Sequence, residues 1–308
     1  MPGYYIKRIH WLQLVIFAFA SSSLGLLLFV NNPGKQRSNS ELPYLANAGA
    51  HVHAVYPTIC GSITDTAACA PSMKLTAGAN LSNYKWSTGA TTPSIIVNTS
   101  GTYWWETIDL TNNKVVNGDF TAGPNGFTSG YTYIAPTGST GGSGALSAEA
   151  YYTVTTDPKI AHSNFRSFPD HTGNTTGPRN MMVVNGAPTA GVTIWQQSIN
   201  VEPNTDYIFS VWFTSVYFEN PGKLSFSINN IALGDPILLT PGTPDWKNFT
   251  VRWSSNGNTT AVIGIVNQNT AAAGNDFALD DLVFAPVCRN TYNVTLSSSP
   301  PKPSITPQ

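Results

Sequence analysis

The stretch from Asn275 to Phe284, N-D-F-A-L-D-D-L-V-F, constrains the fold more than any other part of the chain. At the two-residue period of a strand, both faces of this stretch are mostly apolar. One face would carry Phe277, Leu279 and Val283, and the other Ala278, Leu282 and Phe284. A strand that is apolar on both faces is expected between two packed layers, so the chain must build structure on either side of it.

Two adjacent carboxylates, Asp280 and Asp281, stand in the middle of this apolar strand and would point to opposite faces. A buried carboxylate is costly unless it is hydrogen-bonded, paired or bound to a metal. No Lys or Arg lies close in sequence, so the pattern favours a hard cation, Ca²⁺. The alternative is that one Asp faces solvent at a strand end and the other caps a turn.

A second stretch, V-V-N-G-D-F at Val115–Phe120, pairs with the first in a family pattern. The two stretches together resemble the first and last strands of galactose-binding-like jelly rolls, the fold of many carbohydrate-binding modules. The resemblance covers residues 113–286. It implies that the two ends of the domain are neighbours and share a structural Ca²⁺ site, here Asp119, Asp280 and Asp281. Thr121 stands where the family has an acidic residue.

Residues 58–112 contain short strand candidates separated by Gly, Pro and Asn turn signals, which is typical of a sandwich with Trp86 in its core. The run W-S-T-G-A-T-T-P-S-I followed by S-G-T-Y resembles the Ig-like repeats of gliding-motility and type IX-secreted surface proteins. That resemblance implies a Cys69–Cys288 disulfide, with Cys60 extra. It favours a jelly roll inserted into an Ig-like domain that residues 287–297 complete. The alternative is two successive domains.

Eight or more strand candidates between residues 113 and 286, with no strong helical pattern, predict a double-sheet jelly roll. The expected fold class is therefore all-β: an Ig-like β-sandwich plus a galactose-binding-like jelly roll. Residues 134–148 are rich in Gly, Ser and Thr, and we expect them to form a surface loop too polar to pack.

Both the composition and the N-terminal segment of the chain indicate that the protein is exported. Charged residues make up only 10% of the chain, which suits an extracellular β-rich protein, and the net charge of −1 gives no footprint for nucleic acid. Residues 1–30 carry two basic residues before an apolar run and predict a signal peptide, or alternatively a membrane anchor helix. Residues 31–57 are expected to form a flexible lead-in, and residues 298–308 a Pro-rich linker.

The densest polar cluster, residues 162–185, forms a long loop that leads into a strand, where binding residues commonly lie. Asp170 would accept hydrogen bonds from sugar hydroxyls or bind calcium, and His171 and Arg179 would donate. Trp195 and Tyr217 are the aromatic residues expected to be exposed, whereas Trp212 is expected in the core. The alternative is that Asp170, His171 and Arg179 only stabilise the loop.

No catalytic motif is present: the chain has no G-x-S-x-G, no H-E-x-x-H and no glycine-rich phosphate loop. The prediction is a non-catalytic, exported cell-surface protein that binds a polysaccharide or glycoconjugate through its jelly roll. The alternative is a structural or adhesive segment of a larger surface protein.

Overall fold

A computed structural model describes residues 61–78, 84–172, 179–242 and 245–297, and their regular structure is almost entirely β-strand. The fold class is therefore all-β, as predicted. Two short helical turns interrupt the strands, η1 (Leu110–Asn112) and α1 (Pro158–Ala161). The predicted signal or anchor segment, residues 1–30, lies outside the described residues, as do the lead-in and the C-terminal linker. No helix within the described residues is long and apolar enough to cross a membrane.

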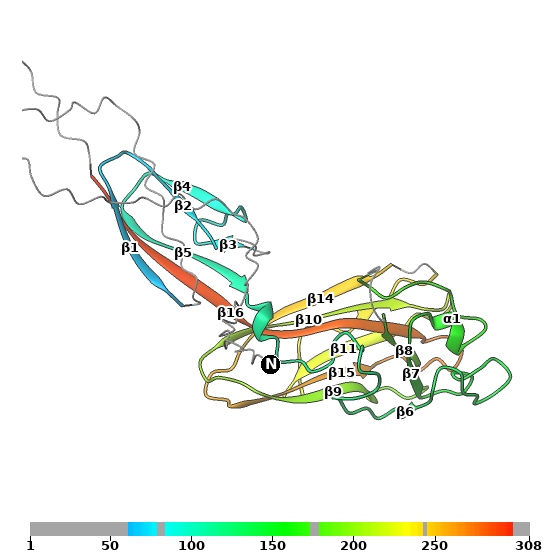
Figure 1. Ribbon diagram of the computed structural model, residues 1–308. Helices are drawn as coiled ribbons and strands as arrows, with labels where there is room; N and C mark the ends of the chain where they lie inside the picture. Colours follow the sequence, from blue (N-terminus) through cyan, green and yellow to red (C-terminus); the bar gives the residue numbers. More distant parts are fainter. Residues whose placement is uncertain (1–60, 79–83, 173–178, 243–244, 298–308) are drawn as a thin grey trace, which may run out of the picture. The chain divides into compact units, whose positions relative to one another are not determined.

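The larger part of the described chain is a jelly roll of two facing sheets (Figure 1). One sheet, called here the front sheet, has the order β14-β10-β16-β8-β7-β6. It consists of β6 (Thr132–Tyr133), β7 (Tyr151–Thr155), β8 (Met181–Asn185), β10 (Asp206–Ser215), β14 (Lys247–Ser254) and β16 (Phe277–Leu296). The back sheet has the order β12-β11-β15-β9, with β13 on β11. It consists of β9 (Thr193–Asn200), β11 (Lys223–Ile228), β12 (Ile231–Ala232), β13 (Ile237–Leu238) and β15 (Thr260–Asn267).

The main core lies between the two sheets and follows from the alternation of apolar residues along each strand. On β10, for example, Tyr207, Phe209 and Phe213 are fully buried and contribute to this core. The rings of Tyr207 and Phe284 stack with centroids 4.9 Å apart, which joins β10 to β16. Aromatic pairs of this kind add to the stabilisation that area burial alone provides.

A smaller sandwich is built from the strands before residue 109 and the end of β16. One of its sheets joins β1 (Ile63–Ala68), β5 (Gly101–Ile108) and β3 (Lys85–Trp86) to β16, and the other pairs β2 (Met73–Thr76) with β4 (Ser94–Val97). Trp86 is buried in its core, as predicted, and stacks on Tyr292 with ring centroids 6.3 Å apart.

Strand β16 belongs to both sandwiches. Its first half pairs with β10 and β8, and its second half pairs antiparallel with β5 and parallel with β1 (Figure 1). Residues 287–296 therefore lie in the sheet of the smaller sandwich. The opening segment of the jelly roll also reaches β16: the Lys114 N–H donates to the Phe284 carbonyl, and the Leu282 N–H donates to the Gly118 carbonyl. The prediction that the two ends of the jelly roll are neighbours is confirmed.

A β-bulge interrupts the pairing of β16 with β10. Ser210 pairs with Val283 and Trp212 with Asp280, so one residue of β10 faces two of β16, and Asp281 has a φ of 46°. The extra residue reverses the alternation beyond it. Leu279 and Leu282 therefore both face the main core, and Asp280 and Asp281 lie together on the opposite, outer face. The predicted placement of the two aspartates on opposite faces is wrong, because the two-residue period assumes a regular strand.

The outer face of the front sheet is covered by its own layer of side chains. Leu146, Ala161 and Phe165 pack there against Val183 and Ala278, and all five are buried. The prediction that residues 134–148 form a surface loop too polar to pack is wrong in part, because Ile134 and Leu146 pack in this layer. The first part of β16, up to Phe284, is thus largely buried on both faces, as its sequence predicts.

The strand register separates the two cysteines predicted to form a disulfide. Ala68 pairs with Leu296, and the Cys69 thiol contacts the Ser297 hydroxyl, whereas Cys288 pairs with Thr107. Eight residues of extended strand separate Cys288 from Leu296, about 26 Å, and a disulfide needs Cα atoms within about 7 Å. The Cys69–Cys288 pairing is therefore incompatible with this fold. Cys288 is disulfide-bonded, and Cys60 lies outside the described residues.

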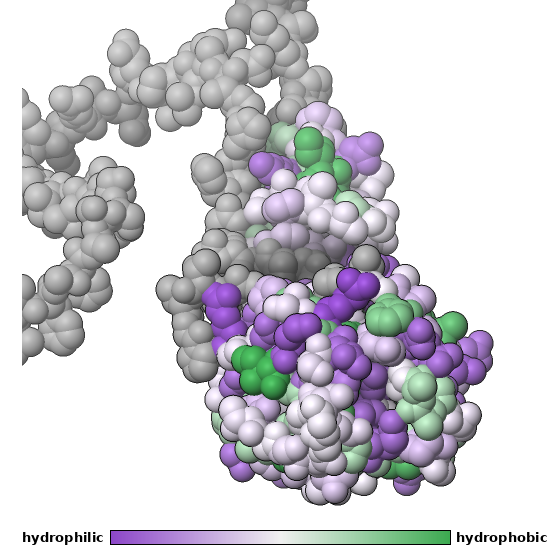
Figure 2. Space-filling model, turned by 90° about the vertical axis from the view of Figure 1, so that its right-hand side faces the viewer, coloured by the Kyte–Doolittle hydropathy of each residue, from purple (hydrophilic) through white to green (hydrophobic). Residues whose placement is uncertain are grey.

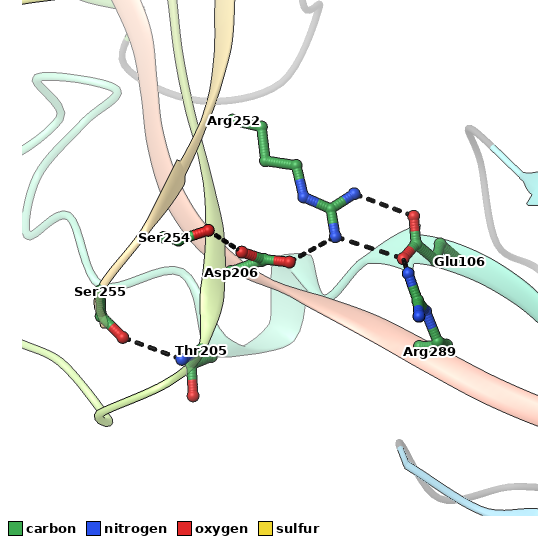
Figure 3. A network of polar contacts seen from close by, with 7 residues as sticks. All are labelled: Glu106, Thr205, Asp206, Arg252, Ser254, Ser255 and Arg289. Atoms are coloured by element: carbon green, nitrogen blue, oxygen red, sulfur yellow. Dashed lines mark hydrogen bonds and ion pairs between the residues drawn. The ribbon is translucent and has the colours of Figure 1, made fainter. Parts of the chain in front are cut away.

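An ion-pair network links the smaller sandwich to the jelly roll (Figure 3). Glu106 on β5 is buried and accepts from Arg289 on β16 and from Arg252 on β14. Arg252 also donates to Asp206 on β10 at 2.5 Å. These guanidinium groups hold the pKa of Glu106 low against the opposing effect of burial, which is the largest single influence on it. The network therefore stabilises the charged form of Glu106 at the junction.

The surface reflects the low content of charged residues. On the face drawn in Figure 2, hydrophobic residues form small separate patches among hydrophilic ones. Exposed positions on the back sheet are mainly uncharged, such as Ser198 and Asn200 on β9. The surface is therefore polar without being strongly charged, in agreement with the composition.

Candidate binding site on the outer face of the jelly roll

His171 lies at the centre of a cluster on the outer face of the front sheet. Its backbone N–H donates to Asp280 Oδ2 at 2.9 Å, and its ring Nδ1 lies 2.7 Å from Asp281 Oδ2. The loop that carries His171 is thereby attached to the middle of β16. Both carboxylates reach one histidine because the bulge turns Asp281 to the same side as Asp280.

The bulge also provides hydrogen bonds that make the buried carboxyl group tolerable. The Asp281 N–H donates to Asp280 Oδ1 at 2.8 Å, so each oxygen of Asp280 accepts from a backbone N–H. Asp280 is 1% exposed. Burial, and then the charges of Asp281 and Asp170, nevertheless raise the pKa of Asp280 to about 8. Asp280 is therefore protonated at neutral pH and holds the loop without adding charge.

Two tryptophans complete the cluster. The ring of His171 stacks on Trp212 of β10 with centroids 3.8 Å apart and an interplanar angle of 15°, and it meets Trp246 edge-on at 5.7 Å. Phe168 packs against Trp246 from the covering layer. The side chains of His171 and Asp281 each remain 23% exposed, and both tryptophans are half-buried. Solvent therefore reaches a histidine whose position is fixed by a carboxylate on one side and an indole on the other.

Asp170, next to His171, is buried and accepts from the Thr172 hydroxyl at 2.9 Å. Its charge is one of the causes of the raised pKa of Asp280. The structure thus brings together Asp170 and His171, predicted as ligand-binding residues, with Asp280 and Asp281, predicted as metal ligands. What unites them is the contact between the loop and the bulged strand.

The third predicted metal ligand, Asp119, does not join them. Asp119 is exposed and accepts from the Thr121 N–H and hydroxyl. Within the described residues, no group of three His, Cys, Asp or Glu side chains could hold a metal ion. Both oxygens of Asp280 already accept from backbone N–H groups. The three aspartates therefore do not fit a shared calcium site.

The other predicted binding residues lie elsewhere. Trp195 is fully buried in the main core, so its predicted exposure is wrong; the pairing of β9 with β15 turns it inward. Tyr217 is half-buried and packs against the covering layer beside Phe218. Arg179 is half-buried and follows residues 173–178, which are outside the described residues.

Sequence reasoning missed Trp212, which was expected in the core. In D-Y-I-F-S-V-W-F, Trp212 lies two and four residues after Ser210 and Ile208, on the same face of the strand, whereas Phe209 and Phe213 face the core. Strict alternation would have placed Trp212 on the outer face with Ser210. The signal was present in the sequence, but the apolar character of the residue concealed it.

The fold and the cluster together define an all-β protein with a double-sheet jelly roll and a partly exposed His–Asp–Trp cluster on the front sheet. No protein-family model matches the sequence, and no curated protein matches it.

Several solved structures are similar to part of the chain. A "Family 16 Carbohydrate Binding Module-2" is 15% identical over 56% of this chain and 99% of its own, with a TM-score of 0.31. TmCBM61 in complex with beta-1,4-galactotriose is 16% identical over 57% and 97%, with a TM-score of 0.32. The Stig cyclase Fisc from Fischerella sp. TAU is 14% identical over 57% and 96%, with a TM-score of 0.38.

Proposed function

We propose that this protein is a non-catalytic binding protein that recognises a glycan at the His171 cluster. The observation that carries the proposal is the histidine itself, which is held by Asp281, stacked on Trp212 and still open to solvent. The site combines partly exposed aromatic surface with polar groups in fixed positions. That combination suits a sugar, which presents an apolar C–H face and hydroxyl groups at its edges.

The polar groups are arranged to receive hydroxyl groups. With Nδ1 directed at Asp281, the other ring nitrogen of His171 is the one left for a ligand. Asp281 engages the histidine through Oδ2, which leaves Oδ1 to accept from a ligand hydroxyl. Trp246, edge-on to the histidine, would pack against the apolar face of the sugar. The contact of His171 with Asp280 keeps these groups in place before a ligand binds.

A binding role is favoured over a catalytic one by the surroundings of the His171–Asp281 pair. Among the described residues, no Ser, Thr or Cys side chain donates a hydrogen bond to either member of the pair. A His–Asp pair activates a nucleophile only when the nucleophile is within hydrogen-bond reach of the histidine. The nearby Thr172 hydroxyl is directed at Asp170 instead.

An extracellular location belongs to the same proposal. A disulfide at Cys288 supports an oxidising compartment, and the scarcity of charged residues is in keeping with it. Glycans of cell walls and cell surfaces are reached there.

The test is a broad glycan array with the native protein, followed by titration of any hit against His171→Ala and Trp246→Ala. We expect each variant to weaken binding by at least about 10-fold, because each removes a fixed contact of about 1.4 kcal/mol or more. The matched control is His162→Ala: His162 lies on the same covering segment and packs on Phe165 with ring centroids 4.4 Å apart. Melting temperatures of all variants separate lost binding from lost folding.

A structural or adhesive role without a small ligand is the second candidate. It is favoured by the fact that His171 is about three-quarters buried and contributes to packing of the loop. Native protein that binds nothing on the array, with a lower melting temperature for His171→Ala, would support this candidate and reject the glycan proposal. Binding that survives both substitutions would reject the site.

A further inference from the structure

A second group of polar side chains lies under the covering layer of the front sheet, around Asp276, the residue just before β16. Within the described residues, several buried oxygen atoms there have no hydrogen-bond partner. They are Glu149 Oε2, Asn185 Oδ1, Asp276 Oδ1 and the hydroxyl oxygens of Thr153 and Thr214. Buried polar atoms are almost always partnered, so a concentration of unpartnered oxygens indicates a missing ligand.

The strand register places these oxygens on one face. Asn185 lies on the outer face of β8, since its Nδ2 donates to the Leu146 carbonyl in the covering layer. Phe277 pairs with Val184, so Asp276 falls beside Asn185 on the neighbouring strand. The Asn185 carbonyl accepts a hydrogen bond from the Ala150 N–H. This bond brings Glu149, the residue before Ala150, close to Asn185. Three oxygen-bearing side chains from three segments therefore converge.

Two of the three are carboxyl groups that lack a cationic partner. Asp276 is 5% exposed. Glu149 is half-buried, and its Oε2 atom is shielded from solvent. No Lys, Arg or His is among the groups that act on either carboxyl, and no salt bridge among the described residues includes them. Two like charges at this depth need either protons or a cation.

We propose that Glu149, Asn185 and Asp276 bind a divalent cation, Ca²⁺, beneath the covering layer of the jelly roll. Carboxylate and amide oxygens are the ligands that calcium prefers, and the two carboxylates match its charge. The absence of a sulfur or nitrogen ligand in the set disfavours zinc. The remaining positions around the ion are left for water, since calcium takes about six to eight ligands.

Neighbouring contacts orient two of the ligands toward the ion. The Gly186 N–H hydrogen-bonds the Asp276 carboxylate, and Oδ1 is left unpartnered. The bond from Asn185 Nδ2 to Leu146 likewise fixes the amide, which leaves Oδ1 as the unpartnered atom. Hydrogen bonds from neighbouring groups to the ligand side chains set the geometry of metal sites in proteins. The site is separate from Asp280 and Asp281, whose hydrogen bonds are made with His171.

The experiment measures the melting temperature of EDTA-treated full-length protein during titration with Ca²⁺, with Mg²⁺ as a parallel series. At free Ca²⁺ about 100-fold above Kd, we expect a rise of about 5 to 10 °C for the native protein. Glu149→Gln and Asp276→Asn keep the side-chain shapes and should each raise Kd more than about 10-fold. The control Asp119→Asn changes an exposed aspartate and should keep the full rise.

A second readout does not depend on unfolding. Tb³⁺ replaces Ca²⁺ at oxygen sites and is excited through nearby aromatic rings. Tyr131 is the ring expected to excite it, because, besides burial, the charges of Glu149 and Asp276 both contribute to the raised pKa of its phenol. Native protein and Asp119→Asn should show Tb³⁺ luminescence that Ca²⁺ displaces, and Glu149→Gln should lose it. No calcium effect on the native protein, or an effect that both ligand variants retain, would overturn the proposal. An equal response to Mg²⁺ would reject calcium as the ion.

Discussion

Substitution of Gly118 by alanine tests the closure of the jelly roll, on which the position of β16 depends. A Cβ at residue 118 would lie 2.2 Å from the Leu282 carbonyl oxygen and 3.1 Å from its carbon. The same two residues share the hydrogen bond from the Leu282 N–H to the Gly118 carbonyl, and both are buried. Backbone atoms would have to move by about 1 Å, which breaks this bond and disturbs the bulge that carries Asp281.

The magnitude follows from three contributions. Two buried backbone groups that lose their partners cost about 1–3 kcal/mol each, and overpacking costs about 1–3 kcal/mol. The smaller conformational freedom of alanine in the unfolded chain offsets about 0.4–1 kcal/mol. We therefore expect Gly118→Ala to lower the free energy of unfolding by about 2–8 kcal/mol, measured by guanidinium denaturation followed through tryptophan fluorescence.

The matched control is Gly257→Ala, because a Cβ at residue 257 meets no heavy atom within 4 Å. This variant should remain within about 1 kcal/mol of the native protein. If Gly118→Ala and Gly257→Ala unfold at the same denaturant concentration, the segment around residue 118 does not lie against β16 as described, and the reasoning fails.

Three further predictions concern pH, the junction and the disulfide. Folded Asp280 keeps its proton to a pH of about 8 because burial raises its pKa, whereas in the unfolded chain its pKa lies near the ordinary value of 3.8. The free energy of unfolding should therefore fall by up to about 5 kcal/mol as the pH rises across that window. In denaturation at several pH values, Asp280→Asn should flatten this slope; an unchanged slope contradicts the assignment. Glu106→Gln should cost about 1–2 kcal/mol by thermal unfolding, since its arginine partners are partly exposed, whereas Asp245→Asn, in an exposed pair, should change little. Peptide mapping without reduction should link Cys288 to Cys60, and a link to another cysteine contradicts the register.

The strands were largely predictable because their signal is local. Alternating apolar residues bounded by Gly, Pro and Asn turns predicted short strands in residues 58–112 and in residues 113–286, and the structure has strands in both ranges, β4 and β7 among them. The apolar character of both faces of Asn275–Phe284 likewise predicted a strand buried on both sides. Each of these features depends on residues a few positions apart in the sequence.

The candidate site was predictable only in part, since its geometry depends on contacts between distant residues. Asp170 and His171 were identified from the polar loop, and Asp280 and Asp281 from their conflict with an apolar strand. That the four belong to one cluster could not be inferred, because the β-bulge at Asp281 arises from pairing with β10. Hydrogen bonds to His171 engage both carboxyl groups on the outer face of the front sheet.

The sequence by itself determined the all-β class, the two sandwich segments and the choice of polar residues, because composition and periodicity act along the chain. Only the tertiary structure decided which oxygens lack a partner, that Cys69 lies far from Cys288 and which tryptophan faces solvent. Those outcomes depend on strand register, and a shift of one residue, as at the bulge, moves every following side chain to the other face.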